Sequence, residues 1–403
     1  MAEAPATVSP KTVREIIERA LAGEVLSAVD GYALIGAEGA GLTALLHAAT
    51  EINWSARVNG RVTYSRKVFL PLTNLCRDRC AYCTFVKGPG QRGAHTMTPD
   101  EVLSVARAGA ALGCKEALIS LGDHPEWRHP EMGDTLSAMG YGSTPEYVAS
   151  MSRLVLEETG LLPHTNCGTL DRAEMEAIAP WNASMGIMVE NVSQRLHEKG
   201  GPHYGTASKR PEQRIATLDT AGELGVAMTT GILIGIGETP EERVDSLLAI
   251  RDVHDRHGNI QEIIVQNFRA KPATKMRRAV EPSTADMLRT LATARLLMGP
   301  SMNIQAPPNL NGDGYQSYLL AGMNDWGGVS PLTKDFINPE AAWPEVARLR
   351  SLTAEMGHEL RERTALYPEY VLSGQWATSP AVQDTLAQLV GEDGYVRREL
   401  EQW

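Results

Sequence analysis

Short apolar segments alternate with longer amphipathic ones over most of this 403-residue chain. Such alternation is typical of a parallel sheet covered by helices, because two parallel strands need a crossover connection, usually a helix. Strands and helices are distinguished by their hydrophobic period and length. The eight predicted strands cover residues 67–73, 116–123, 161–167, 183–190, 227–237, 261–268, 302–308 and 323–329.

Eight strand and helix units predict an α/β fold, a (β/α)8 TIM-type barrel that is complete or nearly so. We expect the barrel to occupy residues 61–365. Residues 1–60 have leucine and alanine at helical spacing, so they should form a helical N-terminal extension packed on the barrel. Residues 366–403 are expected to form a C-terminal helical tail.

Helix starts are marked by a hydroxyl residue followed by proline and glutamate. Thr98 and Thr239 each precede a proline and have a glutamate three residues further on, which predicts a capping box at the start of a helix. Thr144 offers a partial version of the same pattern. These starts fall between predicted strands, as the barrel requires.

Three cysteines follow the first predicted strand. Cys76, Cys80 and Cys83 form a C-x-x-x-C-x-x-C pattern. Three thiolates on one short loop can hold three corners of a cubane 4Fe-4S cluster and leave the fourth iron without a protein ligand. Zinc and an electron-transfer cluster are alternatives, but both usually take four protein ligands. Cys114 and Cys167 lie singly beside apolar segments and are expected to be buried structural thiols.

Composition and charge argue against several classes of function and location. The net charge is -11, from 38 Lys and Arg against 49 Asp and Glu, and no block of basic residues stands out, so we expect no nucleic-acid partner. The sequence has no apolar run of the roughly 20 residues that a membrane helix needs and no secretory signal pattern. Five cysteines, three of them crowded together, indicate a reducing compartment, so we expect a cytoplasmic protein without a membrane partner.

The cysteine segment resembles that of radical S-adenosylmethionine (SAM) enzymes, because the aromatic Tyr82 precedes the last cysteine. The resemblance implies a 4Fe-4S cluster whose open iron takes SAM. In that superfamily a Gly-Gly-Glu-like element after the second strand receives the amino group of SAM, and here Gly122 and Asp123 would substitute for it. A G-x-I-x-G-x-x-E pattern lines the adenine, and Gly231 and Gly235 match its glycines.

Other polar residues stand at the ends of predicted strands, where barrels place their chemistry. Glu190 ends the fourth strand and is suited to ribose hydroxyls, and Arg214 could pair with the methionine carboxylate, although either could equally be a solvated helix-end charge. We expect substrate contacts from His164, Gln266, Asn267 and Asp325. No general acid or base can be assigned, although His164 could carry a proton.

Longer runs resemble the 7,8-didemethyl-8-hydroxy-5-deazariboflavin (FO) synthase family, which makes the chromophore of coenzyme F-420. These runs are TYSRKVFLPLTNLCRDRCAYCTF, LGDHPE, GILIGIGET, QNFRAKP and NDWGGVSPLTKDFINPE. The similarity is closest to subunit 1 and to the N-terminal half of the fused actinobacterial synthase. It implies a carbon-nitrogen lyase in which a 5'-deoxyadenosyl radical removes a hydrogen atom from an adduct of tyrosine and 5-amino-6-(ribitylamino)uracil. The third ring then closes with loss of ammonia.

The same resemblance implies partners. Subunit 2, or a fused C-terminal half, would supply the adduct, and ferredoxin or flavodoxin would supply the electron. Two other function classes remain open. One is a sister radical SAM enzyme, either the adduct-forming partner or a menaquinone-pathway homologue. The other is a non-catalytic iron-sulfur electron carrier.

Overall fold

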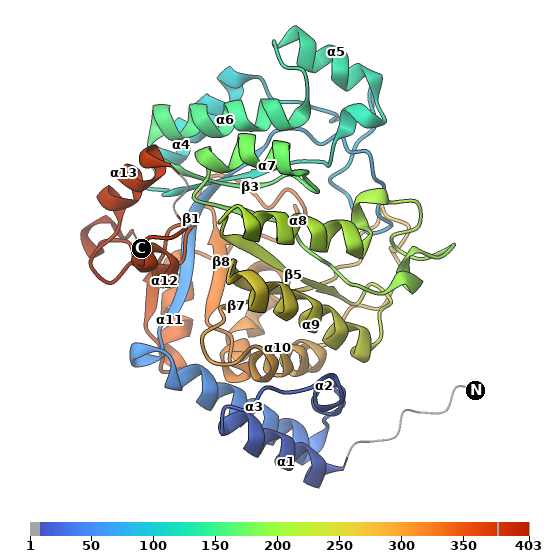
Figure 1. The fold of residues 1–403 in the computed structure, drawn as a ribbon, viewed down its shortest axis with the longest axis vertical. Helices are drawn as coiled ribbons and strands as arrows, with labels where there is room; N and C mark the ends of the chain where they lie inside the picture. The colour runs from blue at the N-terminus through green and yellow to red at the C-terminus, as the bar shows by residue number, and fades with distance from the viewer. Residues whose placement is uncertain (1–8, 377–378, 403) are drawn as a thin grey trace.

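Eight parallel strands close into a barrel (Figure 1). The computed structural model describes residues 9–376 and 379–402. Strand β1 pairs in parallel with both β2 and β8, which closes the ring and confirms the predicted (β/α)8 fold. The barrel strands are β1 (Val62–Pro71), β2 (Glu116–Ser120), β3 (Leu162–Asn166), β4 (Ser184–Gly186), β5 (Met228–Ile234), β6 (Ile260–Asn267), β7 (Ile304–Gln305) and β8 (Asp325–Val329).

A ninth strand, β9 (Leu360–Glu362), was not predicted from the sequence. It pairs in parallel with Val62–Tyr64, the first residues of β1. Strand β1 is ten residues long and pairs with β2 only from Lys67 onward, so its first residues leave an edge that β9 fills. β4 and β7 are shorter than predicted, with three and two residues.

Most helices lie outside the barrel. They are α1 (Pro10–Leu21), α2 (Ala28–Ile35), α3 (Gly39–Ser55), α4 (Pro99–Ala111), α5 (Pro130–Ala138), α6 (Thr144–Thr159), α7 (Arg172–Ile178), α8 (Pro211–Glu223), α9 (Pro240–His257), α10 (Thr284–Met298), α11 (Val346–Glu355), α12 (Pro368–Ser373) and α13 (Pro380–Leu389). Thr98 and Thr239 form the predicted capping boxes of α4 and α9. Helix α6 is capped by Ser143, one residue before the predicted Thr144, because the Ser143 side chain accepts from the backbone N–H of Glu146.

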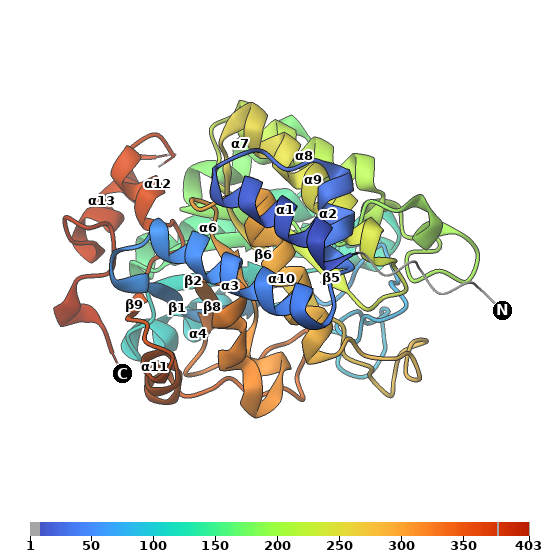
Figure 2. The same ribbon diagram turned by 90° about the horizontal axis from the view of Figure 1, so that it is seen from below.

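The first three helices pack against the outer helices of the barrel (Figure 2). Helix α2 contacts α9, and α3 contacts α10. The α2 contact is close at Gly31, where an added Cβ would lie 2.6 Å from Cγ1 of Val244. This N-terminal unit therefore covers helices rather than the carboxyl ends of the strands.

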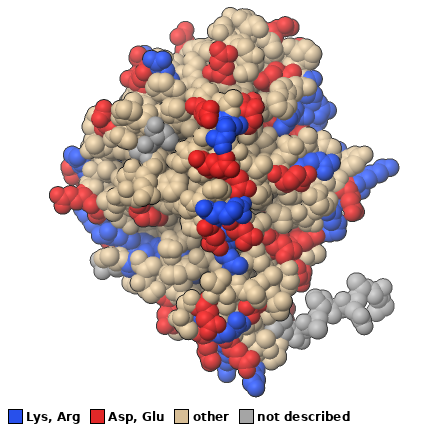
Figure 3. Space-filling model, viewed as in Figure 1, with Lys and Arg blue, Asp and Glu red and all other residues tan. Residues whose placement is uncertain are grey.

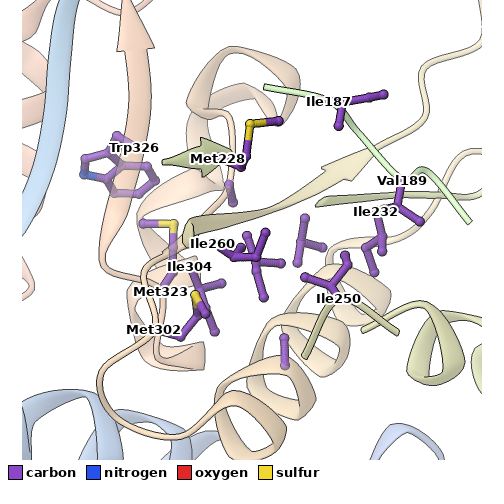
Figure 4. Close-up of a cluster of buried hydrophobic side chains, with 14 of the residues drawn as sticks. Ile187, Val189, Met228, Ile232, Ile250, Ile260, Met302, Ile304, Met323 and Trp326 are labelled. Carbon is purple, nitrogen blue, oxygen red and sulfur yellow. The ribbon is translucent and has the colours of Figure 1, made fainter. Parts of the chain in front are cut away.

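The hydrophobic core lies between the strands and the surrounding helices (Figure 4). Ile232 of β5, Ile260 of β6 and Ile304 of β7 are buried there, with Ile250 of α9. Successive side chains of a strand point to opposite faces, so the alternate residues of the same strands face the inside of the barrel. The outer face supplies the core, which leaves the inner face for a site.

The surface carries interspersed charges. On the face drawn in Figure 3, acidic and basic side chains are interspersed over the middle of the molecule, and a small group of basic side chains lies at the lower left. Within residues 9–376 and 379–402, no helix combines the length and the apolar character needed to span a bilayer.

Candidate active site

A cavity of about 350 Å³ occupies the inside of the barrel and reaches the loops at the carboxyl ends of the strands. Inward-facing residues of seven of the eight strands line it, together with the cysteine loop. β4 contributes through Met188 and Glu190, which follow it. This is the end of a TIM-type barrel at which active sites are found.

The three cysteines of the loop all line this cavity, whereas Cys114 and Cys167 do not. Burial raises the pKa of Cys76 to about 11 and that of Cys80 to about 12. Thiols with raised pKa values bind metal as thiolates and release their protons on binding. Three thiols facing one cavity fit a 4Fe-4S cluster with three protein ligands. Among the described residues, no group of three or more His, Cys, Asp or Glu side chains is placed so that it could hold a single metal ion.

The residues between the first two cysteines tie the loop to its surroundings. Arg77 forms an ion pair with Asp123 after β2, with an N–O distance of 2.5 Å. The buried carboxylate of Asp78 accepts from the backbone N–H groups of Ala207 and Ser208, at 3.0 and 3.1 Å. The loop is therefore attached on two sides, which fixes where the thiols face.

Gly122 and Asp123 support the cysteine loop. A Cβ at Gly122 would lie 1.9 Å from the carbonyl oxygen of Leu75 and 2.6 Å from Cβ of Cys76, so only glycine allows the loop to approach. The Asp123 carboxylate is 4% exposed and also accepts from the backbone N–H of Thr169 at 2.7 Å. Both residues line the cavity, but the Asp123 carboxylate is already engaged by protein donors.

Tyr82 lies in the wall of the cavity beside the cysteines. Its hydroxyl is 2.9 Å from Nε2 of His203, and the residue packs against a buried cluster of Leu196, Leu233, Ile236 and Phe268. Burial lowers the pKa of His203 to about 2, so this imidazole is neutral at physiological pH. The predicted cofactor residue Tyr82 is thus held rigidly at the cavity edge.

Glu190 has a strained backbone. Its φ is +65°, a left-handed conformation that non-glycine residues rarely adopt and that is often found at functional sites. Its carboxylate pairs with Lys209, and both residues line the cavity. Arg214 lines the same wall, but its guanidinium donates to the backbone carbonyls of Ser208 and Met188. The structure places Glu190, Arg214 and Lys209 in the lining of one cavity, and the SAM contacts expected of Glu190 and Arg214 stay a prediction.

The two glycines of the predicted adenine pattern have packing roles. A Cβ at Gly231 would lie 2.1 Å from the carbonyl oxygen of Ile264, so Gly231 allows β5 and β6 to approach. Gly235 has a φ of +90°, and its Cβ would meet Pro282 at 2.4 Å. Neither glycine lines the cavity, whereas Leu233 between them does. The glutamate of the pattern, Glu238, accepts from the backbone N–H groups of residues 235 and 236 and so closes the turn.

His164 of β3 points into the cavity with a defined tautomer. Its Nδ1 lies 2.7 Å from Oγ of Ser184, and that hydroxyl donates to the carbonyl of Ala365 at 2.7 Å. Because the serine proton is used there, Nδ1 must be the donor, which leaves Nε2 as an acceptor. Burial, with a contribution from Lys67, lowers the pKa of His164 to about 4, so the ring is neutral.

The remaining predicted substrate residues separate into two groups. Gln266 and Asn267 of β6 line the cavity. Asp325 of β8 does not line it, which argues against the prediction of a substrate contact. Its carboxylate is fully buried and pairs with Arg363 at 2.6 and 2.9 Å, and it also accepts from Thr63. Asp325 therefore positions Arg363.

Ionisable groups at the amino-terminal end of the cavity were missed by the sequence analysis. Lys67 pairs with Glu116 at 3.0 Å, and Arg363 lies 3.5 Å from Glu262, which accepts from Thr229 at 3.0 Å. Despite burial, Lys67 lowers the pKa of Glu116 to about 2. Burial raises the pKa of Glu262 to about 7. These five residues all line the cavity.

A signal for part of this group was present in the sequence. Lys67, Glu116 and Glu262 are charged residues near the start of apolar predicted strands. Because side chains two positions apart in a strand lie on the same face, each of them shares the inner face with the next inward-facing residue of its strand. Arg363 had no such signal, because it follows the unpredicted strand β9. Gly328 makes room for the lysine, since its Cβ would lie 1.3 Å from Cε of Lys67.

A segment after β8 borders the cavity with Asp335, Ile337 and Trp343. Lys271 donates to the carbonyl of Ile337 at 2.6 Å. The ring of Trp343 stacks on Phe69 of β1, with centroids 5.3 Å apart. This segment therefore adds an aromatic wall to the barrel interior.

Comparisons with known proteins agree with this site. The Radical SAM superfamily profile matches residues 70–250, which include the cysteine loop and Gly235. The crystal structure of methylornithine synthase shares the fold, with a TM-score of 0.68 and 20% identity over 86% of this chain and 97% of that one.

Two sequence relatives are much more similar. FO synthase of Streptomyces coelicolor is 46% identical over 98% of this chain but only 47% of its own length, so the chain spans about half of that protein. The 7,8-didemethyl-8-hydroxy-5-deazariboflavin synthase of Methanopyrus kandleri is 49% identical over 83% of this chain and 100% of its own length. The chain therefore belongs to the 7,8-didemethyl-8-hydroxy-5-deazariboflavin synthase family.

Proposed function

We propose that this chain closes the third ring of 7,8-didemethyl-8-hydroxy-5-deazariboflavin. Its substrate would be the adduct of tyrosine and 5-amino-6-(ribitylamino)uracil, and the reaction releases ammonia, which makes the enzyme a carbon-nitrogen lyase. The observation that carries the proposal is the family relationship, since a synthase of this name is matched over its full length. The three thiols that share one cavity support it.

The family and its radical SAM profile imply a 4Fe-4S cluster and SAM as cofactors. When bound, they supply a 5'-deoxyadenosyl radical that removes a hydrogen atom from the substrate. Cys76, Cys80 and Cys83 would hold the cluster. Glu190 and Lys209 form a fixed ion pair beside them and would contact SAM.

The chain's own residues would bind the adduct and exclude water. Phe69 and Trp343 offer a stacked aromatic wall for a flat ring. His164 of β3 offers a fixed acceptor at Nε2, and Gln266 of β6 offers an amide. A radical confined in a closed barrel is protected from side reactions with solvent.

Two further parts of the proposal concern partners and location. A second synthase subunit, or a fused second half as in the longer relatives, would deliver the adduct. A low-potential carrier such as ferredoxin or flavodoxin would deliver the electron, and the reducing cytoplasm would keep the thiols free.

Activity can be tested on protein purified without oxygen and reconstituted with iron and sulfide. SAM, a reductant and the partner's adduct are added, and 5'-deoxyadenosine and a fluorescent deazaflavin are measured by chromatography. We expect both products, and neither from the Cys80→Ala variant. Absence of 5'-deoxyadenosine would refute the radical reaction. Formation of 5'-deoxyadenosine without deazaflavin would refute only the substrate assignment.

A further inference from the structure

The charged groups at the amino-terminal end of the cavity are already paired with one another. We call this end the floor and define it by Lys67, Glu116, His164, Glu262 and Arg363, all of which line the cavity. Its cations are neutralised, because Lys67 lies 3.0 Å from Glu116 and Arg363 binds the carboxylate of Asp325 through two nitrogens. No cation of the floor is therefore left for an incoming anion.

Apart from the oxygens of the paired carboxylates of Glu116 and Glu262, the hydrogen-bonding groups that remain available to a ligand are neutral. Nε2 of His164 is an acceptor, as fixed by the Ser184 hydroxyl. All three of the side-chain amides of Asn166, Gln266 and Gln305 line the cavity, and within the described part of the chain none of them has a protein hydrogen-bond partner. Neutral amides and an imidazole acceptor suit hydroxyl and N–H groups rather than a charged group.

An apolar belt separates the floor from the cysteine loop. It consists of Phe69, Leu118 and Ile264, each two residues beyond a charged floor residue on the same strand and hence on the same inward face. A reacting ring must lie toward the cysteine loop, where the radical would be formed. A substituent on the far side of such a ring would extend past the belt to the floor.

We propose that the floor binds an uncharged, multiply hydroxylated chain and discriminates against the phosphate ester of that chain. The inference rests on the proposed function, in which the substrate carries a ribityl chain, and assigns that chain to a place in the cavity. Chain hydroxyls donate to His164 Nε2 and to the carboxylates of Glu116 and Glu262, and they exchange hydrogen bonds with the Gln305 amide. Such hydrogen bonds to charged groups are the stronger ones.

A phosphate at the floor meets an unfavourable environment. It has to displace a carboxylate from Lys67 or Arg363, which leaves that carboxylate buried and unpaired, or it has to remain unpaired itself. Either arrangement places two anions close together among buried side chains. The paired floor therefore rejects the ester while it accepts the free polyol.

The test measures binding to the purified full chain with fluorescent probes. The probes are the deazaflavin FO, its phosphate ester on the ribityl chain, and the same ring with a methyl group in place of the chain. We expect the ester and the methyl analogue each to bind at least ~10-fold more weakly than FO, the scale of one lost strong hydrogen bond or more. Equal binding of FO and its phosphate ester would overturn the inference, as would absence of binding by all three probes.

Two variants sharpen the test. Glu116→Gln frees Lys67, so the preference for FO over its ester should shrink several-fold. Gln305→Leu should weaken FO at least ~3-fold and leave the methyl analogue unchanged, since it removes a neutral partner of the chain only. Gln213→Leu, at an exposed position on α8, is the matched control and should change neither. An unchanged preference for FO over its ester in Glu116→Gln, or unchanged FO binding in Gln305→Leu, would contradict the assignment, with circular dichroism confirming that each variant is folded.

Failure here is distinguishable from failure of the proposed function. If the chain makes deazaflavin but binds the ester as well as FO, the floor assignment is wrong and the activity stands. If it makes no deazaflavin but shows the expected probe preference, the floor still recognises a polyol and the reaction assignment is wrong.

Discussion

Arg77, the residue after the first cysteine of the loop, forms an ion pair with Asp123 after β2, with an N–O distance of 2.5 Å. The Arg77 guanidinium also lies over the ring of Trp127, 4.4 Å from its centroid. The pair joins the cysteine loop to a neighbouring strand end. It makes the position of the thiols depend on residues about fifty positions further along the chain.

Removal of this ion pair should weaken cluster binding. In Asp123→Asn the charge attraction to Arg77 is lost while the side-chain volume is kept, so the loop should be less fixed and the iron content after reconstitution should fall. The free energy of unfolding should drop by roughly 1 to 3 kcal/mol, the value of a hydrogen bond to a charged group. Iron per chain and urea unfolding measure both effects. Asp134→Asn, at an exposed position on α5, is the control and should match wild type.

The five cysteines should separate into two classes. Cys80→Ala should lose the brown cluster, because Cys80 lines the cavity with the other loop thiols. Cys167→Ala should keep it, because that thiol is buried outside the cavity lining. Iron analysis and the visible absorption spectrum distinguish the two. A Cys167→Ala variant without iron would show that this division is wrong.

The strained backbone at Glu190 should lower the free energy of unfolding of the chain. Because its φ is +65°, Glu190→Gly should unfold with a free energy about 1 kcal/mol higher than Glu190→Ala. Both variants lose the partner of Lys209, so both should bind SAM more weakly than wild type in calorimetry. Equal stability of the two variants would argue against backbone strain at this position.

The stability of the chain should depend on His124 at alkaline pH. Burial alone would lower the pKa of His124, but hydrogen bonds to Asp123 and Glu174 outweigh it and raise the pKa from 6.5 to about 9. The protonated ring therefore stabilises the folded state fully below pH 6.5, and this contribution is lost as pH rises through 9. Urea unfolding at the two ends of this range should show a larger decline for wild type than for His124→Asn, by about 1 to 3 kcal/mol. Asparagine is the chosen substitute because it tolerates the φ of +32° at this position. Parallel curves for the two proteins would contradict the assignment.

The barrel could be predicted because the sequence signals that mark its strands and helices are local. Hydrophobic period and capping boxes at Thr98 and Thr239 located strands and helices without any knowledge of contacts. Strand β9 escaped prediction because three residues carry too little periodicity, and its pairing partner lies near residue 62, almost 300 positions earlier.

The candidate site also has residues that the sequence identified and residues that it misassigned. Spacing alone singled out Cys76, Cys80 and Cys83, because three ligands on one short loop need no long-range partner to be recognised. Gly231, Gly235 and Asp325 looked like ligand residues but do not line the cavity. The sequence does not show whether a glycine in a strand makes room for a ligand or for a neighbouring strand.

The sequence by itself determined the eight-unit barrel, the cysteine loop and the family to which they point. Only the tertiary structure decided which charged side chains share the interior. Lys67, Glu116, Glu262 and Arg363 come from four segments that are distant along the chain, and the closure of the barrel places them at one end of one cavity. The physical reason is that their ion pairs depend on the register of the strands and on which residues of each strand face the barrel interior. No single segment of the sequence determines either.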